Sequence, residues 1–378
     1  MNQISERVDT ILRSNIIVDT LSHGPILWTD PFIEIADKMI KAEVNPFKIV
    51  QVLITEFSKT VVNDDNYFSE LINAWNKSGV NCVSWTLGPI HEKPYSLEGV
   101  RHNLAYMNYM LENRRDSFLK ILKVEDIEIA KEERKIGIIL NLQDLGFIGT
   151  DLELLEYFFL MGFRVMQLTY NSKNTIGTGC TARRDKGLTE FGMHVIERLN
   201  KLKVIIDISH CGPQTSMDAV LTSKTPIIAS HTLAETVYKH DRAKSDELLH
   251  AIAENGGYIG VLTVPGFLTS EPKTTISNWL DHIDYIINLV GINHVGIGTD
   301  YYGYSLPDNL AAKIGEFIDM LGFRPEHKAN FLDKMVDFEK YDKFPNLING
   351  LISRGYSDTE IGKIAGDNFI QVFKKICG

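Results

Sequence analysis

The sequence predicts an α/β fold, a (β/α)8 TIM barrel, on the basis of three observations. Eight short runs rich in β-forming residues recur along the chain. Most of them are continuous apolar runs without strict alternation, which is typical of parallel strands buried on both faces. Helical patterns lie between them, and strands that alternate with helices indicate a parallel sheet covered by helices. A doubly wound sheet remains the alternative.

The predicted elements follow one another in a regular order. The eight predicted strands are Ile16–Leu21, Val80–Leu87, Ile136–Leu142, Arg164–Tyr170, Val204–Ser209, Pro226–Ser230, Tyr258–Val264 and His294–Thr299. Among the helices between them, one is predicted at Leu188–Leu202. Another covers Ile276–Val290 and stops at Gly291, a residue type that commonly ends helices. Additional helical segments are predicted before the second strand, at Pro31–Lys77, and after the eighth, at Asp308–Gly378.

Composition and charge exclude several classes of protein. With a formal net charge of −10, the chain lacks the basic face that nucleic-acid phosphates require. Its four cysteines are scattered without a C-x-x-C pair, so reduced thiols are expected rather than disulfides. The polar N-terminus has no apolar stretch typical of a signal peptide, and no apolar run approaches the roughly 20 residues that span a bilayer. We therefore expect a cytoplasmic, soluble, single-domain protein (residues 1–378) without nucleic-acid or membrane partners.

Polar residues that could carry chemistry gather at the ends of the predicted strands. In a barrel, the active site lies at the C-terminal ends of the strands. Here the stretches IIDISH and IIASH end in His210 and His231, and GIGTD ends in Asp300. Imidazole and carboxylate groups together form the ligand set of zinc or a similar divalent ion. A single Ser-His pair at a strand end is more often structural, but two in successive strands with an aspartate two strands later favour a metal site.

The first predicted strand ends in VDTLSHG, where Asp19 and His23 flank Leu21. This spacing is not that of a usual pair of metal ligands. Because alternate positions of a strand face the same side, His23 is expected to point where Leu21 points. His23 could therefore join the two strand-end histidines and Asp300 around one ion.

Six longer stretches, in a fixed order from about residue 135 to residue 375, carry a resemblance to a known family. They are RVMQLTYNSKN, GLTEFGMHVIERLNKLKVIIDISH, PIIASH, HDRAKSDELLHAIAENGGYIGV, HVGIGTDYYG and IAGDNFIQVF. Together they resemble the membrane (renal) dipeptidase family, peptidase family M19. The resemblance implies a barrel of the amidohydrolase, or metallo-dependent hydrolase, type with a two-zinc centre that hydrolyses dipeptides.

The family's site residues can be carried over one position at a time. His210 and His231 match its two strand-end histidines, and Asp300 matches its strand-eight aspartate. Arg242, in the stretch HDRA, matches the arginine that holds the substrate carboxylate in the family. The family stretch L-T-H-N reads Leu-Thr-Tyr170-Asn171 in this chain, and the resemblance implies that these last two residues contact substrate.

Other positions depart from the family. Leu21 replaces a metal-binding His of its first strand, and His23 replaces a metal-binding Asp. The metal-bridging Glu corresponds to Gln143, and a His that binds the reaction intermediate corresponds to Gly146. Two divalent ions need anionic ligands between them, which Leu and Gln cannot supply. We therefore expect at most one tightly bound ion, zinc or another divalent metal, or none, with His210, His231 and Asp300 as its ligands and His23 and Gln143 as further candidates.

Three functions remain open. The first is a metal-dependent hydrolase, a dipeptidase-like enzyme with an altered or mononuclear centre that acts on a dipeptide or peptide-like amide, with Asp300 as the catalytic base. The second is an enzyme moved to deamination, ring opening or elimination on another small carboxylated substrate. The third is a non-catalytic barrel that binds a small peptide-like ligand or a protein partner. The retained metal ligands and Arg242 favour the first two, and a homodimer is a compatible assembly.

Overall fold

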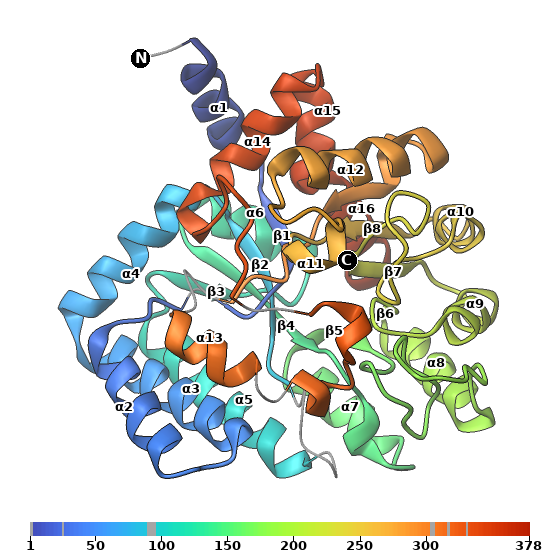
Figure 1. Ribbon diagram of the computed structural model, residues 1–378, viewed down its shortest axis with the longest axis horizontal. Coiled ribbons are helices and arrows are strands. Elements are labelled where there is room, and N and C mark those ends of the chain that lie inside the picture. Colours follow the sequence, from blue (N-terminus) through green and yellow to red (C-terminus); the bar gives the residue numbers. More distant parts are fainter. Residues whose placement is uncertain (1–2, 25, 89–95, 303–306, 316–317, 330–331) are drawn as a thin grey trace.

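Eight parallel strands form a nearly closed barrel in the computed structural model (Figure 1). The structure describes residues 3–24, 26–88, 96–302, 307–315, 318–329 and 332–378. The strand order around the barrel follows the chain order, which confirms the predicted barrel and excludes the doubly wound sheet. The barrel strands are β1 Val18–Ser22, β2 Cys82–Thr86, β4 Ile136–Leu142, β5 Phe163–Gln167, β6 Ile205–Asp207, β7 Ile227–Thr232, β8 Tyr258–Val261 and β9 Val295–Ile297.

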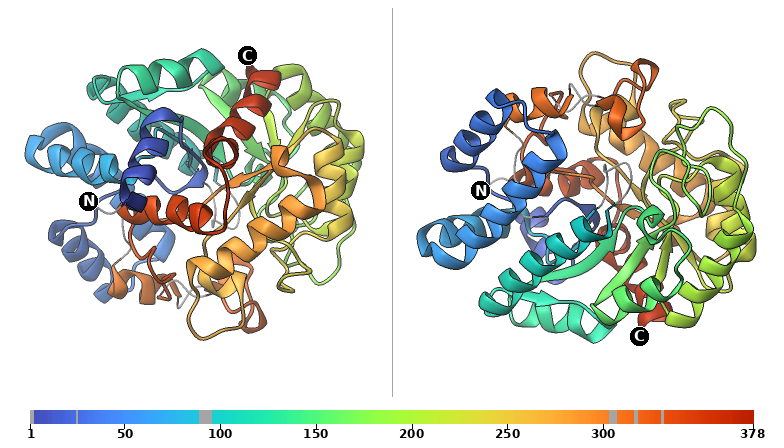
Figure 2. Two further views of the ribbon diagram at one scale, coloured as in Figure 1. Left: turned by 90° about the horizontal axis from the view of Figure 1, so that it is seen from above. Right: turned by 90° about the horizontal axis from the view of Figure 1, so that it is seen from below.

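Helices pack around the outside of the strands (Figure 2). The extra helical segments predicted before the second barrel strand and after the eighth are confirmed, as is the helix that stops at Gly291, whose φ is +90°. None of the helices within the described ranges is long and apolar enough to cross a membrane. The helices are α1 Gln3–Ser14, α2 Asp30–Lys41, α3 Pro46–Asn63, α4 Asp65–Ser78, α5 Leu97–Asn113, α6 Val124–Glu132, α7 Glu153–Leu160, α8 Glu190–Leu202, α9 Pro213–Thr222, α10 Asp246–Glu254, α11 Pro265–Leu268, α12 Ile276–Val290, α13 Asp308–Gly315, α14 Phe344–Ser353, α15 Asp358–Gly362 and α16 Asn368–Cys377.

The sequence does not predict one short strand, β3 Phe118–Lys120. It pairs with residues 136–138 of β4, whereas β5 pairs with residues 140–142 of the same strand. β3 is therefore a side strand off the barrel ring. Three residues with no flanking alternation are too short to stand out from a loop in sequence.

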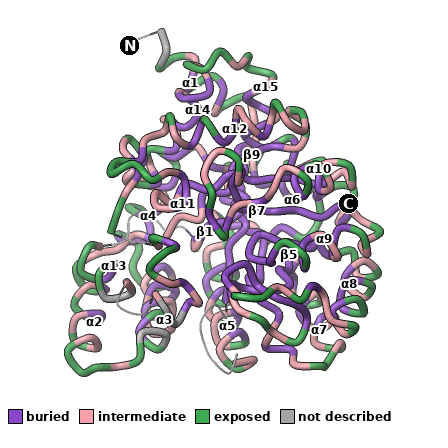
Figure 3. Tube along the Cα trace, turned by 45° about the vertical axis from the view of Figure 1, so that its right-hand side comes forward, coloured by how far each residue is buried: buried purple, intermediate pink, exposed green. Residues whose placement is uncertain are grey.

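The barrel interior is apolar where the strands begin, because α16 closes that end. Phe369 and Phe373 of this helix pack with inward-facing side chains near the strand starts. The tube drawing shows this buried centre enclosed by helices with exposed outer faces (Figure 3). Parallel strands covered on both faces explain the continuous apolar runs in the sequence. The inward-facing residues that share this buried cluster with α16 are Val18, Cys82, Ile139, Val165, Ile205, Ile228 and Tyr258.

A buried carboxylate, Asp19, joins β1 to the end of β9. It accepts hydrogen bonds from the backbone nitrogen of Thr299 at 2.8 Å, from its hydroxyl at 2.6 Å and from the hydroxyl of Tyr341 at 2.7 Å. Complete burial raises the pKa of Asp19 to about 7, although these donors favour the ionised form. Beyond this carboxylate the two strands are linked by an isolated bridge between Ser22 and Tyr301. Asp19 is therefore a residue of the barrel seam.

Replacing Asp19 by Asn is expected to change how stability depends on pH. The folded-state pKa of about 7 lies above the unfolded value of about 3.9, so the folded state binds more protons between these values. Wild-type stability then falls as pH rises through this window. Relative to the wild type, the Asp19→Asn variant should gain about 2–3 kcal/mol in free energy of unfolding between pH 5 and pH 8, measured by urea titration. An exposed Asp308→Asn variant serves as control. An equal difference in free energy of unfolding between variant and wild type at pH 5 and pH 8 would contradict a raised pKa of Asp19.

Candidate metal centre and active site

A buried carboxylate orients His231 at the end of β7. Asp207 accepts hydrogen bonds from the hydroxyls of Ser230 at 2.5 Å and of Ser209 at 2.6 Å. Because Ser230 donates its hydroxyl proton to Asp207, its oxygen accepts from Nδ1 of His231, 2.8 Å away. Burial holds the pKa of His231 well below its ordinary value, so the ring is neutral. Its Nε2 therefore carries an unshared lone pair.

An asparagine orients His210, which follows β6, in the same way. The carboxamide nitrogen of Asn171 donates to the carbonyl oxygen of Leu321 at 2.8 Å, which fixes the orientation of the amide. Its oxygen Oδ1 then lies 2.6 Å from Nδ1 of His210 and must accept a proton from it. Tyr170 stacks on the His210 ring with centroids 4.1 Å apart. In the neutral ring, Nε2 of His210 again carries the lone pair.

The two histidines point these lone pairs at each other. Their Nε2 atoms are 2.8 Å apart, and both rings are buried. Two acceptors at this distance repel unless a proton or a cation lies between them. Two nitrogen ligands of a tetrahedral zinc are roughly 3.3 Å apart, so a shift of about half an ångström would let His210 and His231 share one ion. The donor chemistry of this pair therefore fits a single divalent cation.

His23 and Asp300 form a second pair at the mouth. Nε2 of His23 lies 3.4 Å from Oδ1 of Asp300, and the His23 ring stacks on Tyr302 with centroids 4.1 Å apart. Asp300 has a left-handed backbone with φ +58°, and its nitrogen donates to the Leu21 carbonyl at 2.9 Å. Burial alone would raise the pKa of Asp300, but its electrostatic interactions with the nearby histidines and Arg242 and its hydrogen bond with His23 outweigh burial and lower the pKa. Asp300 is therefore held as a carboxylate.

The predicted ligands thus lie in two neighbouring pairs. Within the described part of the chain, no three His, Cys, Asp or Glu side chains are grouped closely enough to hold a metal ion. Gln143 lies elsewhere in the hydrogen-bond network: its carbonyl accepts from Nε2 of Gln167, and its own side-chain nitrogen has no partner among the described residues. Binding of one ion by His210, His231 and Asp300 therefore requires the two pairs to approach each other.

Arg242 lies behind the histidines and is completely buried. Its guanidinium donates to the carbonyl oxygens of Ser209 and, at 3.0 Å, of His231. Its Nε has no hydrogen-bond partner in the described ranges. Buried cations are usually paired with carboxylates, whereas these contacts are to neutral carbonyls, so the positive charge at the mouth is only partly offset.

A small recess opens beside Asp300. It is lined by residues of the β8 and β9 ends and of the segment around Met335, with a volume of about 60 Å³. Each enclosed water needs roughly 10–15 Å³ on this measure, so the recess holds a few waters and not a dipeptide.

Sequence reasoning missed Ser209, Ser230 and Tyr302, and it assigned Asn171 to substrate contact and not to the orientation of His210. Ser209 and Ser230 precede the two histidines directly, so the repeated Ser-His pair is the signal that could have pointed to them. The stacking of Tyr302 and the contact of Asn171 with Leu321 depend on loop geometry, for which the sequence offers no such signal.

A parallel eight-stranded barrel with histidines and an aspartate at its C-terminal mouth has the architecture of amidohydrolase-type barrels. The chain belongs to the membrane dipeptidase family, peptidase family M19, whose family model matches residues 6–323. The resemblance identified in the sequence is thereby confirmed.

Individual proteins are similar to this chain over much of its length. An uncharacterised protein of Klebsiella pneumoniae is 26% identical over 283 residues, which cover 72% of this chain and 94% of that protein. An uncharacterised dipeptidase of Schizosaccharomyces pombe is 29% identical over 266 residues, which cover 68% of this chain and 58% of that protein. The crystal structure of an amidohydrolase from Pseudomonas aeruginosa superimposes with a TM-score of 0.78 at 26% identity and covers 98% of both chains.

Proposed function

We propose that this protein is a metal-dependent hydrolase of a dipeptide or peptide-like amide that works with at most one divalent ion. The observation that carries the proposal is the 2.8 Å approach of two histidine Nε2 lone pairs, which a bound cation would stabilise. His210, His231 and Asp300 would hold the ion, with His23 as a fourth candidate. The residues available do not fit a second ion, because Leu21 has no donor atom and Gln143 has no charge.

Each residue of the mouth has a role in this proposal. A bound zinc ion supplies Lewis acidity that activates water for attack on an amide carbonyl. Asp300 accepts the proton of the attacking water, a role consistent with a carboxylate that its neighbours keep ionised. Asn171 and Tyr170 keep the His210 ring in place, and a substrate would meet these two side chains at the mouth.

Arg242 would attract the carboxylate of the substrate. Its charge has no carboxylate partner among the described residues, and guanidinium is the side chain best suited to a planar carboxylate. Arg242 also donates to the carbonyl oxygens of Ser209 and His231, so it helps to hold the two histidines in place. Part of its influence on substrate binding is therefore indirect. A small peptide with a free carboxyl group is therefore the proposed substrate class.

Metal analysis followed by a dipeptide panel tests this function. After the protein is loaded with excess zinc and the unbound metal is removed, elemental analysis by inductively coupled plasma mass spectrometry should find at most one zinc per chain. Hydrolysis of simple L,L- and L,D-dipeptides should be roughly a hundredfold or more slower than that of a relative with complete two-zinc ligands, because the positions of the bridging Glu and the intermediate-binding His hold Gln143 and Gly146. Two zinc ions per chain with fast dipeptide hydrolysis would refute the charge argument.

A second candidate is an enzyme that performs another reaction on a small carboxylated substrate. The replaced residues Leu21 and Gln143 favour it, since they alter the metal site and not Arg242. One bound zinc with no dipeptide hydrolysis, but turnover of a carboxylated lactam or amine, would select this candidate. Absence of metal under all loading conditions would instead favour a non-catalytic binding protein.

A further inference from the structure

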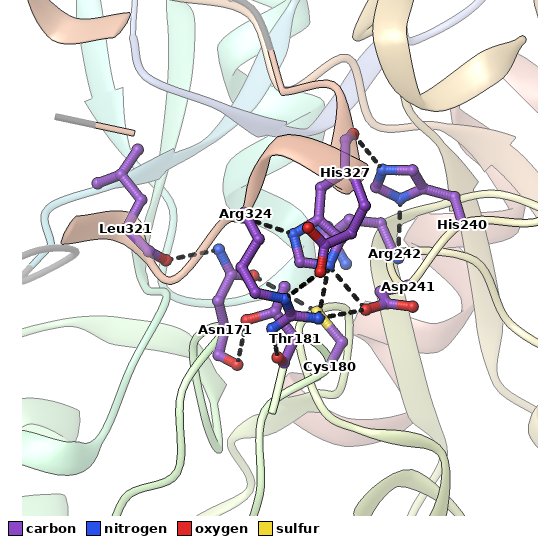
Figure 4. Close-up of polar contacts among 10 residues, drawn as sticks. Asn171, Cys180, Thr181, His240, Asp241, Arg242, Leu321, Arg324 and His327 are labelled. Carbon is purple, nitrogen blue, oxygen red and sulfur yellow. Dashed lines mark hydrogen bonds and ion pairs between the residues drawn. The ribbon is translucent and has the colours of Figure 1, made fainter. Parts of the chain in front are cut away.

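We propose that residues 321–328, which we call the strap, close the barrel mouth over the histidine pair and must detach before a substrate can enter. The strap belongs to the segment between β9 and α14. In Figure 4 it lies across the loops that follow β5 and β7. Its contacts depend neither on a metal ion nor on the proposed reaction.

Backbone carbonyls at both ends of the strap bind residues of the mouth. Leu321 accepts from the Asn171 carboxamide at 2.8 Å, and His327 accepts from Nε2 of His240 at 2.7 Å (Figure 4). Asn171 also orients His210, and His240 stands two positions before Arg242. The two ends of the strap are therefore attached to the residues that surround the site.

One carboxylate, Asp241, binds two residues of the strap. It accepts from Nε2 of His327 at 2.7 Å and faces the guanidinium of Arg324 at 3.5 Å. Nδ1 of His327 accepts a hydrogen bond from the backbone nitrogen of Arg324 at 2.8 Å, so Nε2 carries the ring proton. The hydrogen bond from Nε2 to Asp241 therefore does not require a charged ring. Arg324 also donates to the carbonyl of Thr181. We call Asp241, Arg324 and His327 the clasp.

Apolar packing keeps the strap close to the loops. Phe323 is buried and packs against Phe267 of α11 with ring centroids 5.5 Å apart. Gly322 has a left-handed backbone with φ +84°, and a Cβ there would lie 2.9 Å from the Ser172 hydroxyl and 3.2 Å from Cβ of Asn171. A glycine is thus required for this close approach.

The ion pair of the clasp is exposed enough to solvent that it can break and re-form. Asp241 is 47% exposed and Arg324 is 28% exposed, so solvent screens their attraction. Exposed ion pairs of this kind contribute at most about 1 kcal/mol. Because the two histidines are buried, we expect opening of the strap to be the step that admits a substrate to them.

Alkylation of Cys180 reports on this opening. Cys180 is 8% exposed, and its thiol donates to Oδ1 of Asn171 at 3.4 Å, beside the Thr181 carbonyl that Arg324 binds. Iodoacetamide should therefore reach this thiol only when the strap detaches. Cys82, buried in the barrel interior, provides an internal reference within the same chain.

Breaking the clasp should speed alkylation of Cys180. We expect up to about fivefold faster modification in Asp241→Asn and Arg324→Gln variants, read by peptide mass spectrometry, with no change at Cys82. Gly322→Ala should act in the same direction through steric pressure. The control is Arg354→Gln, which removes an exposed arginine that binds Asp281 and Asp284 away from the mouth.

The outcomes separate the strap from general loosening of the fold. Faster modification at both Cys180 and Cys82, or an equal effect of Arg354→Gln, would overturn the proposal, because it would show global unfolding. Unchanged Cys180 modification in all three strap variants would also overturn it. Because the readout is a thiol, these results do not depend on whether the protein proves to be a hydrolase.

Discussion

Replacing Asp300 by Asn should lower kcat/KM by about a thousandfold on the best substrate of the panel, because a neutral amide cannot accept the proton of the attacking water. The structure makes this a precise substitution. Asn has the same shape and, like Asp, tolerates the left-handed backbone found at this position, where φ is +58°. The barrel should therefore fold unchanged, which thermal unfolding would verify.

The matched control for this substitution is Asp333→Asn. Asp333 lines the same recess but is exposed and is not among the proposed ligands. Its replacement should leave kcat/KM within about twofold. If Asp300→Asn retained wild-type activity, the proposed base would be wrong, and Asp300 would be left with a structural role beside His23.

The second large effect concerns metal affinity. His231→Ala or His210→Ala should weaken zinc binding by a hundredfold or more, measured by isothermal titration calorimetry, since each removes one of the two facing nitrogen atoms. Ser230→Ala should have a smaller effect, on the order of tenfold, because it leaves the ligand and removes only the acceptor that fixes its tautomer.

A graded series of this kind distinguishes a metal centre from a structural histidine pair. His294→Ala is the control, because this half-buried histidine contacts the Gly257 carbonyl where β9 begins, at the opposite end of the barrel. Zinc binding that is equally strong in all four variants would place the metal elsewhere. Absence of zinc binding in the wild type would contradict the metal centre itself.

The barrel could be predicted because each of its strands corresponds to its own short apolar run in the sequence. The run Ile136–Leu142 coincides with β4, since a strand buried on both faces is apolar throughout. Five of the other predicted strands extend past the observed ends at the mouth, because loop residues there continue the pattern. The predicted runs Ile16–Leu21 and Pro226–Ser230 instead stop before the ends of β1 and β7. β3 was out of reach for the opposite reason: its three residues form no pattern at all.

The candidate site could be predicted only in part. His210, His231 and Asp300 lie at strand ends, so the fold class alone gathers them at one face. The sequence did not predict the individual contacts of these side chains. His23 contacts Asp300 and Tyr302, whereas Asp19, four residues earlier, accepts hydrogen bonds from Thr299 at the junction of β1 and β9. The strap could not be foreseen, because it depends on contacts between segments that are far apart in the chain, such as Asn171 with Leu321.

The position of α16 beneath the barrel has a consequence for biosynthesis. Its aromatic side chains, Phe369 and Phe373, fill the space that the strand starts leave open, yet they follow every barrel strand in the chain. During translation, the strands emerge from the ribosome before α16, which covers this apolar space, has been synthesised. The barrel therefore cannot reach its final packing until α16 has been made, and in the interval exposed apolar strand starts are a natural target for chaperones.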